Sequence, residues 1–270
     1  MKTLLAITAV ALLAAGADAN AQWQKTPHPA AARARSGEFA LTARAPKTRA
    51  GRPDLSGVWL VDRGPLPKEI LSIEGDEPFP RHMIDVAADL KPEDVAFQPW
   101  AGELFQQRLK GTGSDDPVAN CKPNGVPGVI ANPLPFKIVQ TDDLILILYE
   151  EDTVFRQVFL DGRKPVEDAV PRYLGYSTGR WDGATLVVDT IGFNDMHRLD
   201  ALGHPVSEKL HLTERFRRTD AGHLAVEITV DDPGAYQKPF AYTVTSTLVP
   251  DEDLLEYFCS DNEKDAQHYQ

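Results

Sequence analysis

Three charged side chains fall on strand faces that are otherwise apolar, and they are the first candidates for chemistry. Glu214 shares its face with leucine and phenylalanine side chains, as judged by alternation along residues 208–218. By the same period of two, Arg156 and Asp189 each lie among aliphatic neighbours. Because an unpaired buried charge is strongly unfavourable, we expect Arg156 to bind Glu214 or Asp189 through two parallel hydrogen bonds.

This charged cluster has two interpretations. In the first, it is a structural ion pair inside the fold, as buried pairs often are. In the second, it lines a cavity and is catalytic. Glu214 would then act as general acid or base, Asp189 would orient the substrate or act as partner carboxylate, and Arg156 would stabilise an oxyanion or bind an acidic group.

The segment after residue 191 carries further polar groups. His197 is the histidine best suited to proton transfer, because an imidazole titrates near neutral pH; a solvated loop histidine is the alternative. Asn194 and Asp195 precede it and are candidate substrate-binding residues. Two tyrosines, Tyr149 and Tyr176, are suited either to a ligand pocket or to the core. Glu208 and His211, near the start of the strand that carries Glu214, are the remaining candidates for substrate binding.

Metal and cofactor sites are not predicted. His197, His204 and His211 follow one another at regular intervals, but zinc ligands usually cluster at spacings of roughly two to five residues. His211 also falls on the polar face of its strand. The sequence has no Gly-rich phosphate loop, no serine nucleophile elbow and no paired CxxC motif. We therefore expect no metal and no cofactor.

The elements that must position these residues are mostly strands. From Phe136 onward the hydrophobicity alternates with a period of two. After a first strand from Val58, this predicts strands at 136–141, 144–150, 153–161, 173–179, 184–191, 208–218, 223–231, 236–249 and 253–259. Antiparallel strands joined by short turns favour a meander that closes into a barrel rather than a sandwich. We predict an all-β, lipocalin-like β-barrel.

The part of the chain before Phe136 has a different character. Residues 64–81 and 111–135 are rich in proline and glycine, which indicates loops. Two short helices are predicted in between, at 93–97 and 100–110, because Pro92 and Pro99 suit the first position of a helix.

The first 21 residues have the features of a secretory signal peptide. Lys2 precedes an apolar run that is too short to span a bilayer. Ala19-Asn20-Ala21 fits the cleavage rule and places the mature terminus at Gln22, with cleavage after Ala19 or an uncleaved anchor as alternatives. We expect a periplasmic or secreted protein without a transmembrane segment.

Cysteine usage and charge agree with export. Cys121 and Cys259 are the two cysteines, and an oxidising compartment favours a disulfide between them over two buried free thiols. The formal net charge of −12 argues against nucleic acid as a partner. Residues 22–52 are basic and poor in apolar periodicity, which predicts a solvated linker or a weak tether to an acidic envelope surface. Residues 53–270 then form a single domain of undetermined oligomeric state.

Several segments resemble a large family of uncharacterised exported bacterial proteins. The resemblance rests on the sequences PDLSGVW at 53–59 and GRWDGATLVVDTIGFND at 179–195, and on residues 207–216, and it covers most of 53–268. It implies lipocalin-like β architecture and export, and it names no reaction. Matching positions are Asp189, Asn194, Glu208, His211, Glu214 and Arg215. Ala184 and Val206 depart from the family pattern, where an acidic residue and a histidine are usual, and the second change weakens a family-wide metal or acid-base role for that loop.

The charged cluster and the barrel together predict a cofactor-independent enzyme. It would be a lyase, hydratase or isomerase acting on a small, partly hydrophobic molecule in a barrel cavity. A periplasmic protein that binds such a molecule without turnover is the alternative. A structural or interaction protein of the cell envelope is the third possibility.

Overall fold

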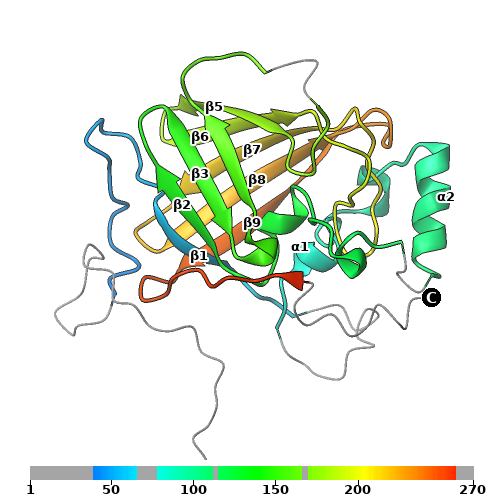
Figure 1. Ribbon diagram of the computed structural model, residues 1–270, viewed down its shortest axis with the longest axis horizontal. Coiled ribbons are helices and arrows are strands. Elements are labelled where there is room, and N and C mark those ends of the chain that lie inside the picture. Colours follow the sequence, from blue (N-terminus) through cyan, green and yellow to red (C-terminus); the bar gives the residue numbers. More distant parts are fainter. Residues whose placement is uncertain (1–38, 66–77, 112–114, 166–169, 260–270) are drawn as a thin grey trace, which may run out of the picture.

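The computed structural model describes residues 39–65, 78–111, 115–165 and 170–259. The predicted signal peptide lies outside these residues. Nine strands form one closed barrel in chain order (Figure 1), which confirms the predicted all-β barrel. The strands are β1 Gly57–Val61, β2 Phe136–Gln140, β3 Leu144–Tyr149, β4 Phe155–Phe159, β5 Tyr176–Asp182, β6 Thr185–Ile191, β7 His211–Arg218, β8 His223–Asp231 and β9 Phe240–Leu248.

The pairing is antiparallel around the barrel except at one seam. β9 closes the barrel on β1, whereas β4 and β5 run parallel. The chain returns along the barrel between these two strands, and they share two register pairs, Val158 with Ser177 and Phe159 with Thr178. The first half of β4 and residues 172–175 border a pocket instead of pairing. The β4–β5 seam is therefore the shortest ladder in the barrel wall.

Two of the predicted strands differ from the structure. The strand expected at 173–179 runs later in the chain, as β5. The strand predicted at 253–259 is wrong, because this segment forms hydrogen bonds with side chains and does not pair with a neighbouring strand. The amide of Leu255 donates to the Glu150 carboxylate (2.8 Å), and Tyr257 exchanges hydrogen bonds with the Thr153 hydroxyl.

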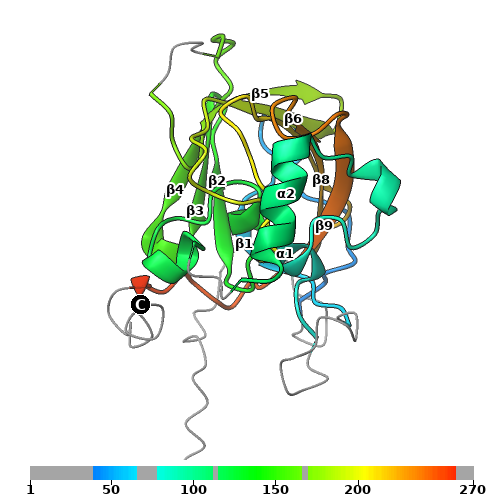
Figure 2. The ribbon, with the colours of Figure 1, turned by 90° about the vertical axis from the view of Figure 1, so that its right-hand side faces the viewer.

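The two barrel ends are closed differently. At one end the Arg218 guanidinium lies 4.9 Å from the Trp59 ring centroid and donates to the Asp54 carbonyl. The other end is covered by helices and loops (Figure 2). The helical segments are α1 Arg81–Ile84, α2 Pro99–Arg108 and the 3₁₀ turns η1 Pro92–Asp94, η2 Val118–Asn120, η3 Gly128–Ile130 and η4 Glu151–Thr153. Pro99 opens α2, which confirms the helix predicted at 100–110, whereas the helix predicted at 93–97 is only the three-residue turn η1 that Pro92 opens.

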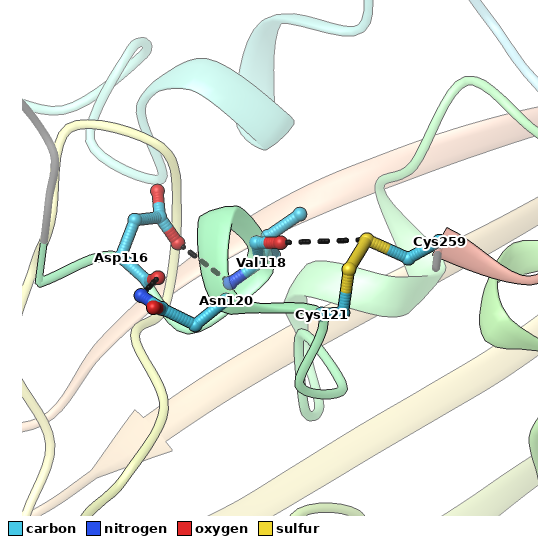
Figure 3. The surroundings of a disulfide bond; sticks show 5 residues. All are labelled: Asp116, Val118, Asn120, Cys121 and Cys259. Carbon is cyan, nitrogen blue, oxygen red and sulfur yellow. Dashed lines mark hydrogen bonds between the residues drawn. A yellow bond between two sulfur atoms is a disulfide. The ribbon is translucent and has the colours of Figure 1, made fainter. Parts of the chain in front are cut away.

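Segments at both ends of the described chain are fixed to the barrel. Ala221 donates its amide to the Ala43 carbonyl (2.8 Å), so this part of the predicted linker packs on the β7–β8 turn. Cys121 and Cys259 form the predicted disulfide, with Cα atoms 5.4 Å apart. It ties the C-terminal segment to the turn after η2 (Figure 3). Within the described residues, no helix has the length and apolar character needed to cross a bilayer.

Candidate functional site

Arg156 and Glu214 meet inside the barrel, which confirms one of the two predicted pairings. Arg156 projects inward from β4 and Glu214 from β7, and their side chains are 2% and 0% exposed. Nη1 of Arg156 donates to Oε1 of Glu214 at 2.9 Å, and Nη2 donates to Oε2. Burial by itself would lower the pKa of the guanidinium, but the carboxylate more than offsets it, so the pKa of Arg156 rises. The guanidinium of Arg156 therefore stays charged.

The strands between β4 and β7 complete the coordination of the guanidinium. Ser177 on β5 accepts from Nε at 2.8 Å, and Thr190 on β6 accepts from Nη2 at 2.6 Å. The two hydroxyls also bond each other at 3.0 Å. Sequence reasoning missed both residues, although the period of two that places Arg156 and Glu214 inward also marks Ser177 and Thr190. Four neighbouring strands thus share one hydrogen-bonded network.

Two tyrosines extend this network into a larger polar region. Tyr149 and Tyr242 are 3% and 5% exposed, and neither hydroxyl has a hydrogen-bond partner among the described residues. Tyr242 lies in one layer with Glu214, because both pair with Ile228 of β8. Burial raises the pKa of each phenol; the positive charge of Arg156 opposes this rise at Tyr149, whereas the charges of Asp200 and Glu214 add to it at Tyr242. We define the interior cluster as Tyr149, Arg156, Ser177, Thr190, Glu214 and Tyr242.

Asp189 does not belong to the interior cluster, so its predicted placement is wrong. It lies on the outer face of β6 with 27% of its side chain exposed, and it binds Arg180 (2.6 Å). Thr213 and His211 also contact it, at 3.1 and 3.3 Å. The aliphatic neighbours misled the assignment, because Val187 is buried on the outward-facing side of the strand.

His197 lies in the covered barrel end rather than beside Glu214. Its ring is 1% exposed, its Nδ1 lies 3.4 Å from Oδ1 of Asn194, and its Nε2 has no partner among the described residues. Burial lowers the pKa of His197 to about 4. Gly125 adjoins the ring so closely that a Cβ there would clash with it. The predicted proton carrier is thus neutral at physiological pH and enclosed by loop residues.

The other predicted binding residues are spread over separate places. Asp195 and Glu208 border a pocket of about 470 Å³ beside α2. His211 is on the barrel exterior, 41% exposed, next to Asp189. Tyr176 stacks on Phe159 at the β4–β5 seam, with ring centroids 5.4 Å apart. The structure therefore does not gather the predicted residues into one site.

A second pocket, of about 500 Å³, opens at the β4–β5 seam, and we call it the seam pocket. Aromatic and cationic side chains surround it: Phe155, Phe159, Arg172, Tyr173 and Tyr176. Arg156 and Ser177 also border it, so the seam pocket and the interior cluster share two residues. Sequence reasoning could not locate this pocket, because it depends on where β4 and β5 part.

One further group of side chains could hold a metal ion. Asp85, Asp200 and His204 each offer one ligand atom, and these atoms lie within 4.8 Å of one another. Nδ1 of His204 lies 2.5 Å from Oδ2 of Asp200. His197 and His211, which lie seven residues before and after His204 in the sequence, are elsewhere in the structure. The three regularly spaced histidines therefore do not form a set of metal ligands.

Comparison with known proteins adds no assignment, since no protein-family model, curated protein or solved structure matches the chain.

Proposed function

We propose that the protein is an exported binding protein for a small organic anion with an aromatic or apolar body, and that this ligand occupies the seam pocket. The observation that carries the proposal is the pocket lining, which combines several aromatic rings with cationic side chains. A volume of about 500 Å³ is in the range of ligand pockets, which run from roughly 300 to 1,000 Å³.

The lining offers both parts of the recognition. Phe155 is 57% exposed, so its ring is available to contact a ligand. Arg172 is exposed, and no ion pair of its guanidinium is found among the described residues. Arg163 lies over the Phe159 ring at 3.9 Å while its guanidinium pairs with the Asp161 carboxylate, so Arg172 is the cation left to bind an anion. A planar anion could stack on the rings and bind Arg172.

The contacts of the interior cluster favour a structural role beside the pocket over a catalytic role. Both oxygens of Glu214 bind Arg156, and the carboxylate has no exposed surface. Proton transfer to a substrate would require that pair to open. Arg156 also binds Ser177 across the seam, where the strand ladder is short. We infer that the pair positions the pocket wall, and that binding rather than turnover is the better account.

Acid-base catalysis is the second candidate, and one observation favours it. The hydroxyl of Tyr242 is buried and finds no hydrogen-bond partner in the described part of the chain, a state that a bound polar molecule would relieve. Such a molecule would reach the interior cluster through the seam pocket. A lyase, hydratase or isomerase would then use Tyr242 as a proton donor to the substrate.

Export is part of the proposal. The Cys121–Cys259 disulfide supports an oxidising compartment such as the periplasm or the extracellular space. The predicted signal peptide agrees with it.

The binding proposal is tested with a fluorescent aromatic sulfonate, 8-anilinonaphthalene-1-sulfonate, titrated into the purified mature protein. Arg172→Gln should weaken saturable binding about tenfold, equivalent to about 1.4 kcal/mol. Arg217→Gln is the matched control, because Arg217 is an exposed arginine on β7 away from the seam. It should change the affinity less than about twofold. Absence of saturable binding, or equal weakening in both variants, would refute the proposal.

Turnover is then examined with the same protein. Aromatic and aliphatic carboxylates that displace the probe are incubated with it and analysed by mass spectrometry and chromatography. We expect each compound to be recovered unchanged. Conversion by the wild type that is lost in Tyr242→Phe would establish the enzyme instead.

A further inference from the structure

Asp85, Asp200 and His204 come from two loops that are joined at the covered end of the barrel. Asp85 follows α1, and the other two residues belong to the loop between β6 and β7. The amides of Ala201 and Leu202 donate to the carbonyls of Met83 and Ile84, at 2.8 and 3.0 Å. These bonds fix the two loops to each other, so the three side chains converge on a preformed centre.

The geometry points to a binding site for a divalent transition-metal ion, with Zn²⁺ the best match, formed by Asp85, Asp200 and His204. One imidazole nitrogen with two carboxylate oxygens is a usual protein donor set for Zn²⁺, and water completes four-fold coordination. Ca²⁺ and Mg²⁺ fit less well, because both prefer a shell made entirely of oxygen. This inference does not depend on the seam pocket.

The side chains are held as metal ligands usually are. Asp200 accepts hydrogen bonds from the amides of Val86 (2.8 Å), Gly203 (2.9 Å) and His204 (3.1 Å), which fix its carboxylate. The His204 ring lies 4.2 Å from the ring of Phe105 and 5.6 Å from that of Phe97. Outer hydrogen bonds and packing of this kind orient first ligands and strengthen metal binding.

The electrostatics also favour a cation. Asp200 and His204 are 3% exposed, so their side chains are shielded from bulk solvent. Asp85 interacts electrostatically with His82, Asp200 and His204, and no lysine or arginine is among these neighbours. A divalent ion would neutralise both carboxylates.

Two polar groups on the barrel side of the three residues lack partners. Nδ1 of His82 and the hydroxyl of Tyr242 are both buried without a hydrogen bond among the described residues, and their rings lie 4.8 Å apart. His82 acts electrostatically on Asp85, and Asp200 acts on Tyr242. Water molecules of a hydrated ion would give these groups partners.

Metal binding requires a small rearrangement. Nδ1 of His204 and Oδ2 of Asp200 are 2.5 Å apart, within hydrogen-bond distance. Two ligand atoms bound to Zn²⁺ at about 2.0 to 2.1 Å in tetrahedral geometry lie roughly 3.3 Å apart. The ion would therefore take the place of this hydrogen bond while the two atoms separate by roughly 1 Å.

The test is isothermal titration calorimetry of the chelator-treated mature protein with Zn²⁺, and with Ca²⁺ for comparison. The wild type should bind one Zn²⁺ per chain and bind Ca²⁺ at least tenfold more weakly. Asp85→Asn should weaken Zn²⁺ binding at least tenfold. Asp89→Asn is the matched control, because Asp89 lies in the same loop but pairs with Arg81. It should change the affinity less than twofold.

Three results would overturn the inference: no stoichiometric Zn²⁺ binding, an Asp85→Asn protein that binds like the wild type, or equal losses in both variants. Circular dichroism verifies that each variant is folded. If Asp85→Asn does not fold, Co²⁺ is added to the wild type and amide signals are followed by nuclear magnetic resonance. Broadening centred on Val86 and Gly203 supports the site, and broadening elsewhere refutes it.

Discussion

Replacement of Glu214 by glutamine separates a structural role of the interior cluster from a catalytic one. The change preserves the side-chain shape but removes the charge that Arg156 faces. Arg156 is 2% exposed, and its bonds to Ser177 and Thr190 supply dipoles but no counter-charge. Removing one partner of a buried ion pair typically destabilises a protein by about 3–5 kcal/mol. Since domains are stable by about 5–15 kcal/mol, Glu214→Gln should lose about a fifth or more of the unfolding free energy.

The assay is urea unfolding followed by circular dichroism, with the free energy extrapolated to water. The denaturant slope should stay constant while the midpoint falls, because the exposed surface on unfolding is the same. Glu227→Gln is the control, since Glu227 is an exposed carboxylate on the adjacent strand β8. It should change the free energy by less than about 0.5 kcal/mol. A Glu214→Gln protein within about 1 kcal/mol of the wild type would refute the structural role.

A double substitution sharpens the same experiment. Arg156→Met with Glu214→Leu removes both charges and leaves apolar groups of similar length. Replacing a complete buried pair in this way is often neutral or stabilising. The double variant should therefore be more stable than Glu214→Gln alone by about 2 kcal/mol or more. If the double variant loses as much stability as Arg156→Met and Glu214→Leu lose in total when measured separately, the two residues are not energetically coupled and the structural role of the pair is refuted.

Two further predictions concern the covered barrel end. Because the pKa of His197 is about 4 in the folded protein and about 6.5 when unfolded, folding favours the neutral ring. This contribution is complete above about pH 6.5 and decreases as the pH falls towards 4, by up to about 3 kcal/mol. The urea midpoint measured against pH should follow this decrease, and His197→Leu should flatten it; an unchanged slope would contradict the assignment. Reduction of the Cys121–Cys259 disulfide, which spans 138 residues, should destabilise the protein by about 5 kcal/mol on the chain-entropy estimate, measured by urea unfolding with and without reductant. A loss below about 1 kcal/mol would show that the unfolded chain gains little freedom.

Alternation in the sequence located the ion pair but could not assign every charge to a face. Arg156 and Glu214 lie in strands whose inward positions are regularly buried, so the period of two was sufficient. In β6 three consecutive residues, Leu186 to Val188, are buried, and this run removes the parity signal around Asp189. Local pattern therefore fails where packing covers the outer face of a strand.

Hydrophobic alternation does not report contacts between residues that lie far apart in the sequence. His204 and Asp200 are close in sequence, but Asp85 reaches them only because two loops are joined over the barrel end. The sequence contains no local spacing that reports this contact. The C-terminal segment shows that local alternation can also mislead. The pattern of residues 253–259 predicts a strand, but backbone amides of this segment donate to the side chains of Glu150 and Thr153.

The parallel seam gives the buried ion pair of Arg156 and Glu214 a structural role in the barrel. Between β4 and β5 the ladder contributes two register pairs, whereas β7 and β8 share eight. Arg156 spans this weak join, because its guanidinium bonds β5, β6 and β7 at the same time. An aliphatic side chain at that position would pack but would not fix the relative height of these strands. The seam can therefore stay open enough to form a pocket while the strands on either side remain in register. On this reasoning the Arg156→Met, Glu214→Leu double variant should keep its stability yet bind the aromatic sulfonate probe more weakly than the wild type. Unchanged probe affinity in that variant would show that the pocket is positioned by other contacts.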